Sequence, residues 1–147
     1  MVGIWGMGGV GKTSILKLIY NHFKEMRGIF DAVIWLTISQ KYEITNLQAS
    51  MAETLNLNLE GISDKDIRKM KLSASLRGKK FLLILDDLWR SIDLTEIGVT
   101  FEDDHNCSKV LMSSRSSDVI GEMGASANYS LRIQPLSTEE GLVLFKR

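Results

Sequence analysis

The glycine-rich segment at residues 6–13, GMGGVGKT, constrains this chain more than any other feature. It matches the pattern G-x-x-x-x-G-K-[ST], with a short β-type run before it and a helical pattern after it. In that context the backbone N–H groups of the segment form a concave cradle, and glycines leave room for phosphate oxygens to approach. The segment therefore predicts a phosphate-binding loop, or P-loop, between the first strand and the first helix of an α/β fold.

The residue types of the loop predict separate roles toward a purine nucleoside triphosphate with Mg²⁺. Lys12 supplies a full positive charge near the β- and γ-phosphates, at the positive end of the helix dipole. Thr13 supplies a hydroxyl ligand for Mg²⁺. Ser14 is a candidate for the α-phosphate, and a surface hydroxyl in the first helical turn is its alternative interpretation. The predicted phosphate-binding residues are Gly6, Gly8, Gly9, Gly11, Lys12, Thr13 and Ser14.

Short β-branched and aliphatic runs alternate along the chain with longer segments of helical period. That alternation is typical of an α/β domain built on a parallel sheet. The middle three of five runs are nearly all apolar, which is typical of strands covered by helices on both faces, so we predict that they are central. The sequence predicts a three-layer P-loop NTPase fold with a mainly parallel five-stranded sheet. Its strands are expected at residues 2–5, 32–38, 81–85, 110–113 and 129–133.

Two of the predicted helices carry specific expectations about burial. Apolar residues surround much of the circumference of the segment at 15–23, which predicts a helix packed deeply against the sheet. Ser63, followed by an aspartate three residues later, predicts the start of another helix. We expect the buried stripe of that helix to include Ile67, Met70 and Ala74.

The two ends of the sequence resemble cut edges. Ser137 followed by Glu140 is a capping box that predicts a last helix, which runs to the end of the chain without a stop signal. The first residue stands directly before the first strand. We therefore interpret residues 1–147 as one P-loop nucleotide-binding domain, a fragment truncated at both ends of a larger protein.

Charged residues follow two of the apolar strands, at the sheet edge where a parallel α/β fold binds its ligand. Asp86 is predicted to hold Mg²⁺ directly or through water, as a Walker B aspartate does. Asp87 is the candidate catalytic residue, in the place where fast P-loop ATPases carry a glutamate that orients the attacking water. It is one methylene shorter, which predicts slow turnover. Arg115 is predicted to contact the γ-phosphate, or alternatively a local carboxylate or solvent, and Ser113 and Ser114 are secondary candidates.

The overall composition limits the classes of partner. Acidic and basic residues balance at 18 each, so no broad positive field for nucleic acid is expected. No apolar run approaches the roughly 20 residues of a membrane span, so we expect no membrane span and a cytoplasmic protein. The three tryptophans, Trp5, Trp35 and Trp89, are interpreted as core or interface anchors and not as catalytic groups.

Four motifs in order carry a resemblance to a known family. They lie at residues 6–13, 30–36, 81–89 and 109–115, and residues 136–140 with 144–145 continue the likeness. Together they resemble the nucleotide-binding (NB-ARC) domain of plant disease-resistance proteins, which are intracellular immune receptors of the nucleotide-binding, leucine-rich-repeat type. A tryptophan at Trp89 resembles the subclass with an N-terminal coiled coil.

The resemblance implies an ADP/ATP switch. ADP would hold the receptor closed, exchange for ATP would open it, and slow Mg²⁺-dependent hydrolysis by a weak ATPase would reset it. The glycines, Lys12, Thr13 and Ser14 would hold phosphate and Mg²⁺. Asp86 and Asp87 would act on metal and water, and Arg115 on the γ-phosphate. The implied partners are the nucleotide, the remaining receptor domains and other copies of the same chain in a homo-oligomer formed on activation.

Two other functions compete with the switch. A P-loop enzyme, such as a small-molecule kinase or a fast ATPase, would need an acceptor site and usually an arginine-rich lid, and the sequence contains no such segment. A structural module with a degenerate P-loop is disfavoured by the intact Lys12, Thr13 and Asp86.

Overall fold

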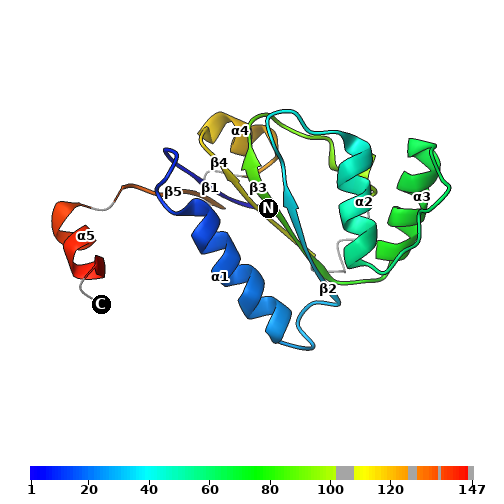
Figure 1. Cartoon of the computed structure of the whole chain (residues 1–147), viewed down its shortest axis with the longest axis horizontal. Coiled ribbons are helices and arrows are strands. Elements are labelled where there is room, and N and C mark those ends of the chain that lie inside the picture. The colour runs from blue at the N-terminus through cyan, green and yellow to red at the C-terminus, as the bar shows by residue number, and fades with distance from the viewer. Residues whose placement is uncertain (102–107, 126–128, 136, 146–147) are drawn as a thin grey trace.

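The computed structural model describes residues 1–101, 108–125, 129–135 and 137–145 and contains one parallel sheet (Figure 1). The strand order is β2-β3-β4-β1-β5, and every pair of neighbouring strands is parallel. The predicted α/β fold with a parallel five-stranded sheet is therefore confirmed. The strands are β1 Val2–Trp5, β2 Ala32–Thr37, β3 Phe81–Leu88, β4 Lys109–Ser114 and β5 Ser130–Arg132.

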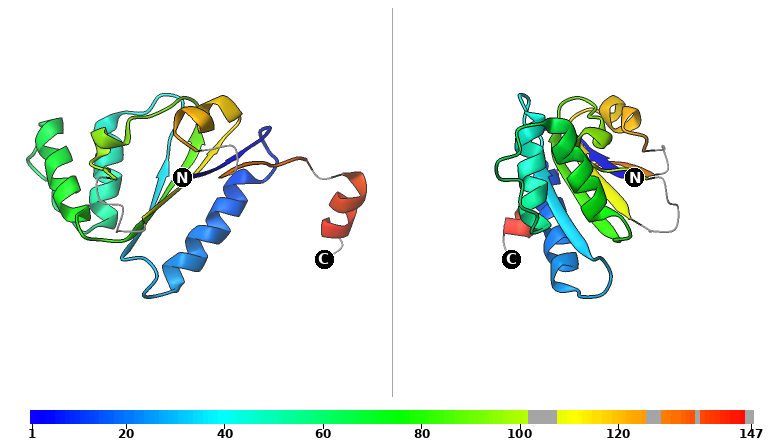
Figure 2. Two further views of the ribbon diagram at one scale, coloured as in Figure 1. Left: turned by 180° about the vertical axis from the view of Figure 1, so that it is seen from behind. Right: turned by 90° about the vertical axis from the view of Figure 1, so that its right-hand side faces the viewer.

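Helices cover both faces of this sheet, which makes three layers (Figure 2). Helix α1 packs on one face, whereas α2, α3, η1 and α4 lie on the other side, and α5 stands apart beyond the β5 edge. A capping box at Ser137 and Glu140 starts α5, as predicted. The helices are α1 Lys12–Glu25, α2 Ile44–Thr54, α3 Lys65–Leu76, the 3₁₀ helix η1 Leu94–Ile97, α4 Ser117–Glu122 and α5 Thr138–Phe145.

The core has two halves, one on each face of the sheet. Alternate residues of β3 belong to different halves: Leu82 and Ile84 pack with Leu16 of α1, whereas Leu83 and Leu85 pack with the helices of the opposite face. All four of these β3 residues are buried. Burial on both faces explains the unbroken apolar sequence of β3.

The prediction that β2 is a central strand is wrong. Strand β2 forms one edge of the sheet, and β1 takes the interior place between β4 and β5. Its apolar sequence has another cause: Trp35 packs in the α1 half of the core, while Ile34 and Leu36 are buried in the other half. Both faces of β2 are covered, although its outer edge has no strand neighbour. The apolar composition of β2 therefore reflects burial of its two faces and does not indicate a central place in the strand order.

The deep packing expected for α1 against the sheet is limited to one stripe of the helix. Leu16 is the one fully buried residue of α1, whereas Leu18 is 71% exposed. A helix that covers a sheet from outside meets it along one stripe, and Leu18 falls outside that stripe.

In α3 the expected buried stripe is replaced by a different one. Ile67 is 48% exposed and Met70 is 69% exposed, whereas Leu72 and Leu76 are buried. These two leucines are spaced by four residues and lie on the face of α3 that meets α2 and η1. Ala74, the third residue of the expected stripe, is exposed, and the helix is capped by Asp64 in place of the predicted Ser63.

A β-bulge shapes the end of β3 that faces the functional site. Leu85 pairs with Met112 and Leu88 with Ser114, so Asp86 and Asp87 together lie opposite the single residue Ser113. Asp87 takes a positive φ of 62°, in the left-handed region that aspartate tolerates better than most residues. The strand thus continues past the predicted end at Leu85, and the bulge sets the positions of both acids.

Candidate functional site

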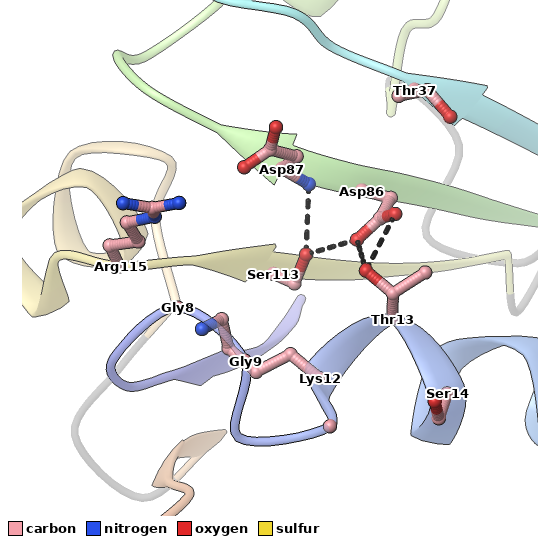
Figure 3. A pocket seen from close by; sticks show the side chains of 11 residues that line it. Gly8, Gly9, Lys12, Thr13, Ser14, Thr37, Asp86, Asp87, Ser113 and Arg115 are labelled. Carbon is pink, nitrogen blue, oxygen red and sulfur yellow. Dashed lines mark hydrogen bonds between the residues drawn. The ribbon is translucent and has the colours of Figure 1, made fainter.

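A cavity of about 420 Å³ opens at the carboxyl ends of the strands, beside the N-terminus of α1 (Figure 3). It gathers the residues predicted for phosphate, metal and water, with two exceptions: Gly6 and the secondary candidate Ser114 are buried and do not line the cavity, and the Ser114 hydroxyl donates to the carbonyl of Leu88. The lining residues are Gly8, Gly9, Gly11, Lys12, Thr13, Ser14, Thr37, Asp86, Asp87, Ser113 and Arg115.

Three of the P-loop glycines are required, for two different reasons. A Cβ atom at Gly6 would collide with the backbone carbonyl oxygen of Ile133, and one at Gly8 would lie 3.0 Å from Cζ of Arg115. Gly9 and Gly11 have open space around them but take positive φ values of 81° and 99°. Close approach of the backbone therefore explains Gly6, and backbone conformation explains Gly9 and Gly11, whereas Gly8 meets only the movable end of the Arg115 side chain.

The start of α1 offers unpaired N–H groups to the cavity. Gly11 is the N-cap and provides no side-chain cap, and the first turn contains no acidic residue. The first N–H groups of a helix have no partner within it, and the helix dipole adds positive potential at this end. An anion such as phosphate suits this position.

The side chain of Lys12 lines the cavity and reaches back to the start of the P-loop. Its Nζ donates hydrogen bonds of 2.6 Å to the carbonyl oxygens of Gly6 and Met7. Burial lowers the pKa of Lys12 and the nearby charge of Arg115 lowers it further, while Asp87 and Asp86 act in the opposite direction. The ammonium is therefore held among groups of both signs, and a phosphate is an anion that would stabilise its charge.

A hydroxyl network surrounds the carboxylate of Asp86, which is 5% exposed. The hydroxyl of Thr13 lies 3.1 and 3.0 Å from the two carboxylate oxygens, and Ser113 donates to Oδ1 at 2.6 Å. The N–H of Asp87 donates to the same serine hydroxyl at 2.9 Å. Ser113 thus connects both acids of the bulge (Figure 3).

The donor set at Asp86 fits Mg²⁺. Carboxylate and hydroxyl oxygens are hard ligands, and Mg²⁺ is usually bound by one or two carboxylates together with substrate phosphates and water. Within the described ranges, no group of three or more His, Cys, Asp or Glu residues gathers in a way that could hold a metal. Thr13 and Asp86 would therefore supply only part of a coordination shell, as expected for a metal that binds with a nucleotide.

Asp87 and Arg115 lie on the other side of the cavity from Thr13 (Figure 3). The carboxylate of Asp87 accepts a hydrogen bond from the indole nitrogen of Trp89 at 3.2 Å. The guanidinium of Arg115 lies over the ring of the same tryptophan, 5.1 Å from its centroid. An acid of β3 and a cation that directly follows β4 thus contact the same indole.

Comparison with known families agrees with this geometry. The NB-ARC domain family matches residues 1–147. The chain belongs to the NB-ARC family. It is 38% identical over 148 residues to the disease resistance protein UNI of Arabidopsis thaliana, with 99% of this chain and 16% of that protein covered. The disease resistance protein RFL1 of the same plant is 37% identical, with 100% and 17% covered. The NB-ARC chain therefore spans about a sixth of the length of these relatives.

A solved structure supports the fold independently. The ORC1 protein of Aeropyrum pernix, solved in complex with DNA, matches 99% of the NB-ARC chain and 42% of its own chain with a TM-score of 0.70. At 14% sequence identity this likeness concerns the α/β architecture alone. Across the described part of the chain no helix has the length and apolar character needed to cross a membrane. The coiled-coil subclass stays a prediction.

Thr37 is a lining residue that sequence reasoning missed. It ends β2 in register with Asp86, and its hydroxyl accepts a hydrogen bond from the indole nitrogen of Trp35 at 3.0 Å. A polar residue near the end of an apolar strand was the available signal. Because the strand order does not follow from the sequence, nothing placed this end of β2 beside Asp86.

Proposed function

We propose that this NB-ARC domain is the ADP/ATP-binding switch of an intracellular plant immune receptor, and that it hydrolyses ATP slowly with Mg²⁺. The observation that carries the proposal is the arrangement of the cavity. The P-loop, the Thr13–Asp86 pair, Asp87 and Arg115 all line one cavity. Such a cavity has groups for the phosphates that ADP and ATP share, and further groups for a third phosphate.

The shared phosphates are assigned to the loop and the start of α1. In this proposal Lys12 and the backbone of Gly8, Gly9 and Gly11 bind phosphate oxygens. Gly6, which was expected to bind phosphate too, shapes the loop from its buried position, where its N–H donates to the carbonyl of Ser114. Ser14, which lines the cavity, is assigned to the α-phosphate. Thr13 and Asp86 hold Mg²⁺, which would neutralise phosphate charge when bound.

Arg115 is assigned to the γ-phosphate and Asp87 to the attacking water. A guanidinium suits phosphate because it presents several N–H donors in a plane. Asp87 would orient the water and accept its proton. Its short side chain and its bond to Trp89 support slow hydrolysis, because a poorly placed base loses orders of magnitude in rate. Slow hydrolysis suits a switch, which acts through different affinities in its two states.

The proposed switch would act together with the rest of the receptor. The remaining domains of the receptor would sense the nucleotide state, and copies of the chain would assemble into a homo-oligomer after ATP binding. The protein would act in the cytoplasm. The balanced charge, at 18 acidic and 18 basic residues, gives no support for nucleic acid as a partner.

The nucleotide that copurifies with the full-length protein tests the proposal. Chromatography of the supernatant after denaturation should find close to one ADP per chain, and Lys12→Ala should reduce it strongly. An empty site in the wild-type protein would contradict the switch and favour a degenerate P-loop. Continuous turnover of ATP at a kinase-like rate of about 1–100 s⁻¹ would favour an enzyme instead.

A further inference from the structure

Trp89 contacts both charged residues on the Arg115 side of the cavity without lining the cavity itself. Its indole N–H donates to Oδ2 of Asp87 at 3.2 Å, and its ring faces the guanidinium of Arg115 at 5.1 Å. Trp89 directly follows β3 and Arg115 directly follows β4. One indole therefore contacts two residues from the ends of neighbouring strands.

Arg115 has a second neighbour in the P-loop. A Cβ atom placed on Gly8 would lie 3.0 Å from both Cζ and Nη2 of Arg115, so the guanidinium packs against the P-loop. The guanidinium therefore contacts both Gly8 and the indole of Trp89. An exposed arginine otherwise samples many rotamers, and ordering it on a ligand has an entropic cost. A ring that already holds the guanidinium at the loop lowers that cost.

We propose that Trp89 is a positioning residue for the triphosphate state: its ring supports Arg115 against the P-loop while its N–H holds the carboxylate of Asp87. The inference rests on the proposed function, because it explains how the same site distinguishes ATP from ADP. Arg115 is assigned to the γ-phosphate alone. The affinity for ATP therefore depends on Trp89, and the affinity for ADP does not.

Two substitutions separate this role from a general effect on folding. Trp89→Leu removes both the ring and the N–H, whereas Trp89→Phe keeps an aromatic face for Arg115. Trp89 is 43% exposed, so both variants are expected to fold. The matched control is Tyr42→Leu, which removes a similar cation–π contact with Arg90 at 5.0 Å, away from the cavity lining.

The experiment is titration calorimetry of the full-length protein, freed of nucleotide, with ADP and with a non-hydrolysable ATP analogue at fixed Mg²⁺. In Trp89→Leu the ratio of ATP-analogue affinity to ADP affinity should fall about three- to tenfold, the range expected for one partly exposed cation–π contact. ADP affinity should stay within about twofold of the wild type. In Trp89→Phe the ratio should lie closer to the wild-type value than in Trp89→Leu. In Tyr42→Leu the ratio should equal that of the wild type.

Three results would overturn the proposal. The first is an unchanged ratio of ATP-analogue affinity to ADP affinity in Trp89→Leu. The second is an equal loss of affinity for both nucleotides in that variant. The third is a ratio in Trp89→Phe that is as low as in Trp89→Leu. Failure of the proposed function is recognised separately: a nucleotide-free wild-type protein that binds neither nucleotide defeats the switch itself, before any variant is compared.

Discussion

The hydroxyl of Thr13 lies 3.1 and 3.0 Å from the two carboxylate oxygens of Asp86, although the two residues are 73 positions apart in the sequence. One belongs to the first turn of α1 and the other to the end of β3. The parallel sheet brings the two motifs together, because the carboxyl ends of its strands share one edge with the start of α1. This contact joins the predicted phosphate site to the predicted metal site.

Lys12→Ala should weaken the binding of both ADP and ATP by about 10- to 100-fold, which corresponds to the loss of a charged hydrogen-bonding group. Lys12→Arg should also weaken it, because a planar fork does not replace a compact ammonium between phosphates. The fold should survive both changes. Calorimetry measures the affinities, and Lys17→Ala, on the exposed side of the same helix, is the control. Unchanged affinity in both Lys12 variants would remove this lysine from the site.

Ser113→Ala should lower the free energy of unfolding by about 1–3 kcal/mol, because it leaves the N–H of Asp87 without its acceptor and removes a donor to Asp86. It should also reduce the gain in ATP affinity on adding Mg²⁺. Ser114→Ala is the matched control: Ser114 is equally buried at 1% exposure, but it donates to the carbonyl of Leu88. Denaturant unfolding and calorimetry compare the two variants. A Mg²⁺ effect of the same size in Ser114→Ala would argue against the assigned network.

Arg115→Gln should lower the affinity for an ATP analogue by about tenfold and leave ADP affinity within about twofold, because a charge-assisted contact to one phosphate is lost. Competition with a fluorescent nucleotide measures both constants. Arg90→Gln is the control, since Arg90 lies over Tyr42, outside the cavity. If Arg115→Gln weakened ADP as much as ATP, the arginine would not be a γ-phosphate residue.

Single-turnover hydrolysis of ATP by the full-length protein should be slower than the 1–100 s⁻¹ typical of kinases. Asp87→Asn should slow it further without reducing ATP affinity. Asparagine is a cleaner replacement than alanine because Asp87 has a φ of 62°, and asparagine tolerates that region. A wild-type rate inside the kinase range that is lost in Asp87→Asn would show a competent base and favour the enzyme alternative.

Local chemistry made much of this molecule predictable. The P-loop, the acids near the end of β3 and the capping box at Ser137 each depend on residues close together in sequence, and the structure brings the loop and the acids to one cavity and caps α5 at Ser137. Periodicity also found the five strands. These features need no knowledge of which elements are neighbours.

The features that were missed depend on tertiary contacts. The edge position of β2 follows from the strand order, and the exposure of Leu18 and Met70 follows from where each helix meets its neighbours. The bulge at Asp86 and Asp87 is visible only in the register with β4, and the same register assigns Ser113 to both acids. The sequence pointed to the two acids that line the cavity but contained no signal for what connects them.

The most direct test of the account is the dependence of ATP binding on Mg²⁺ in the wild-type protein and in Asp86→Asn. Calorimetry with ATP, in excess Mg²⁺ and then in a chelator, gives the gain in affinity that the metal provides. We predict a clear gain in the wild-type protein and nearly none in Asp86→Asn, with metal-free affinity preserved because the P-loop is intact. The same Mg²⁺ gain in both proteins would show that the Thr13–Asp86 pair does not hold the metal, and would contradict the site described above.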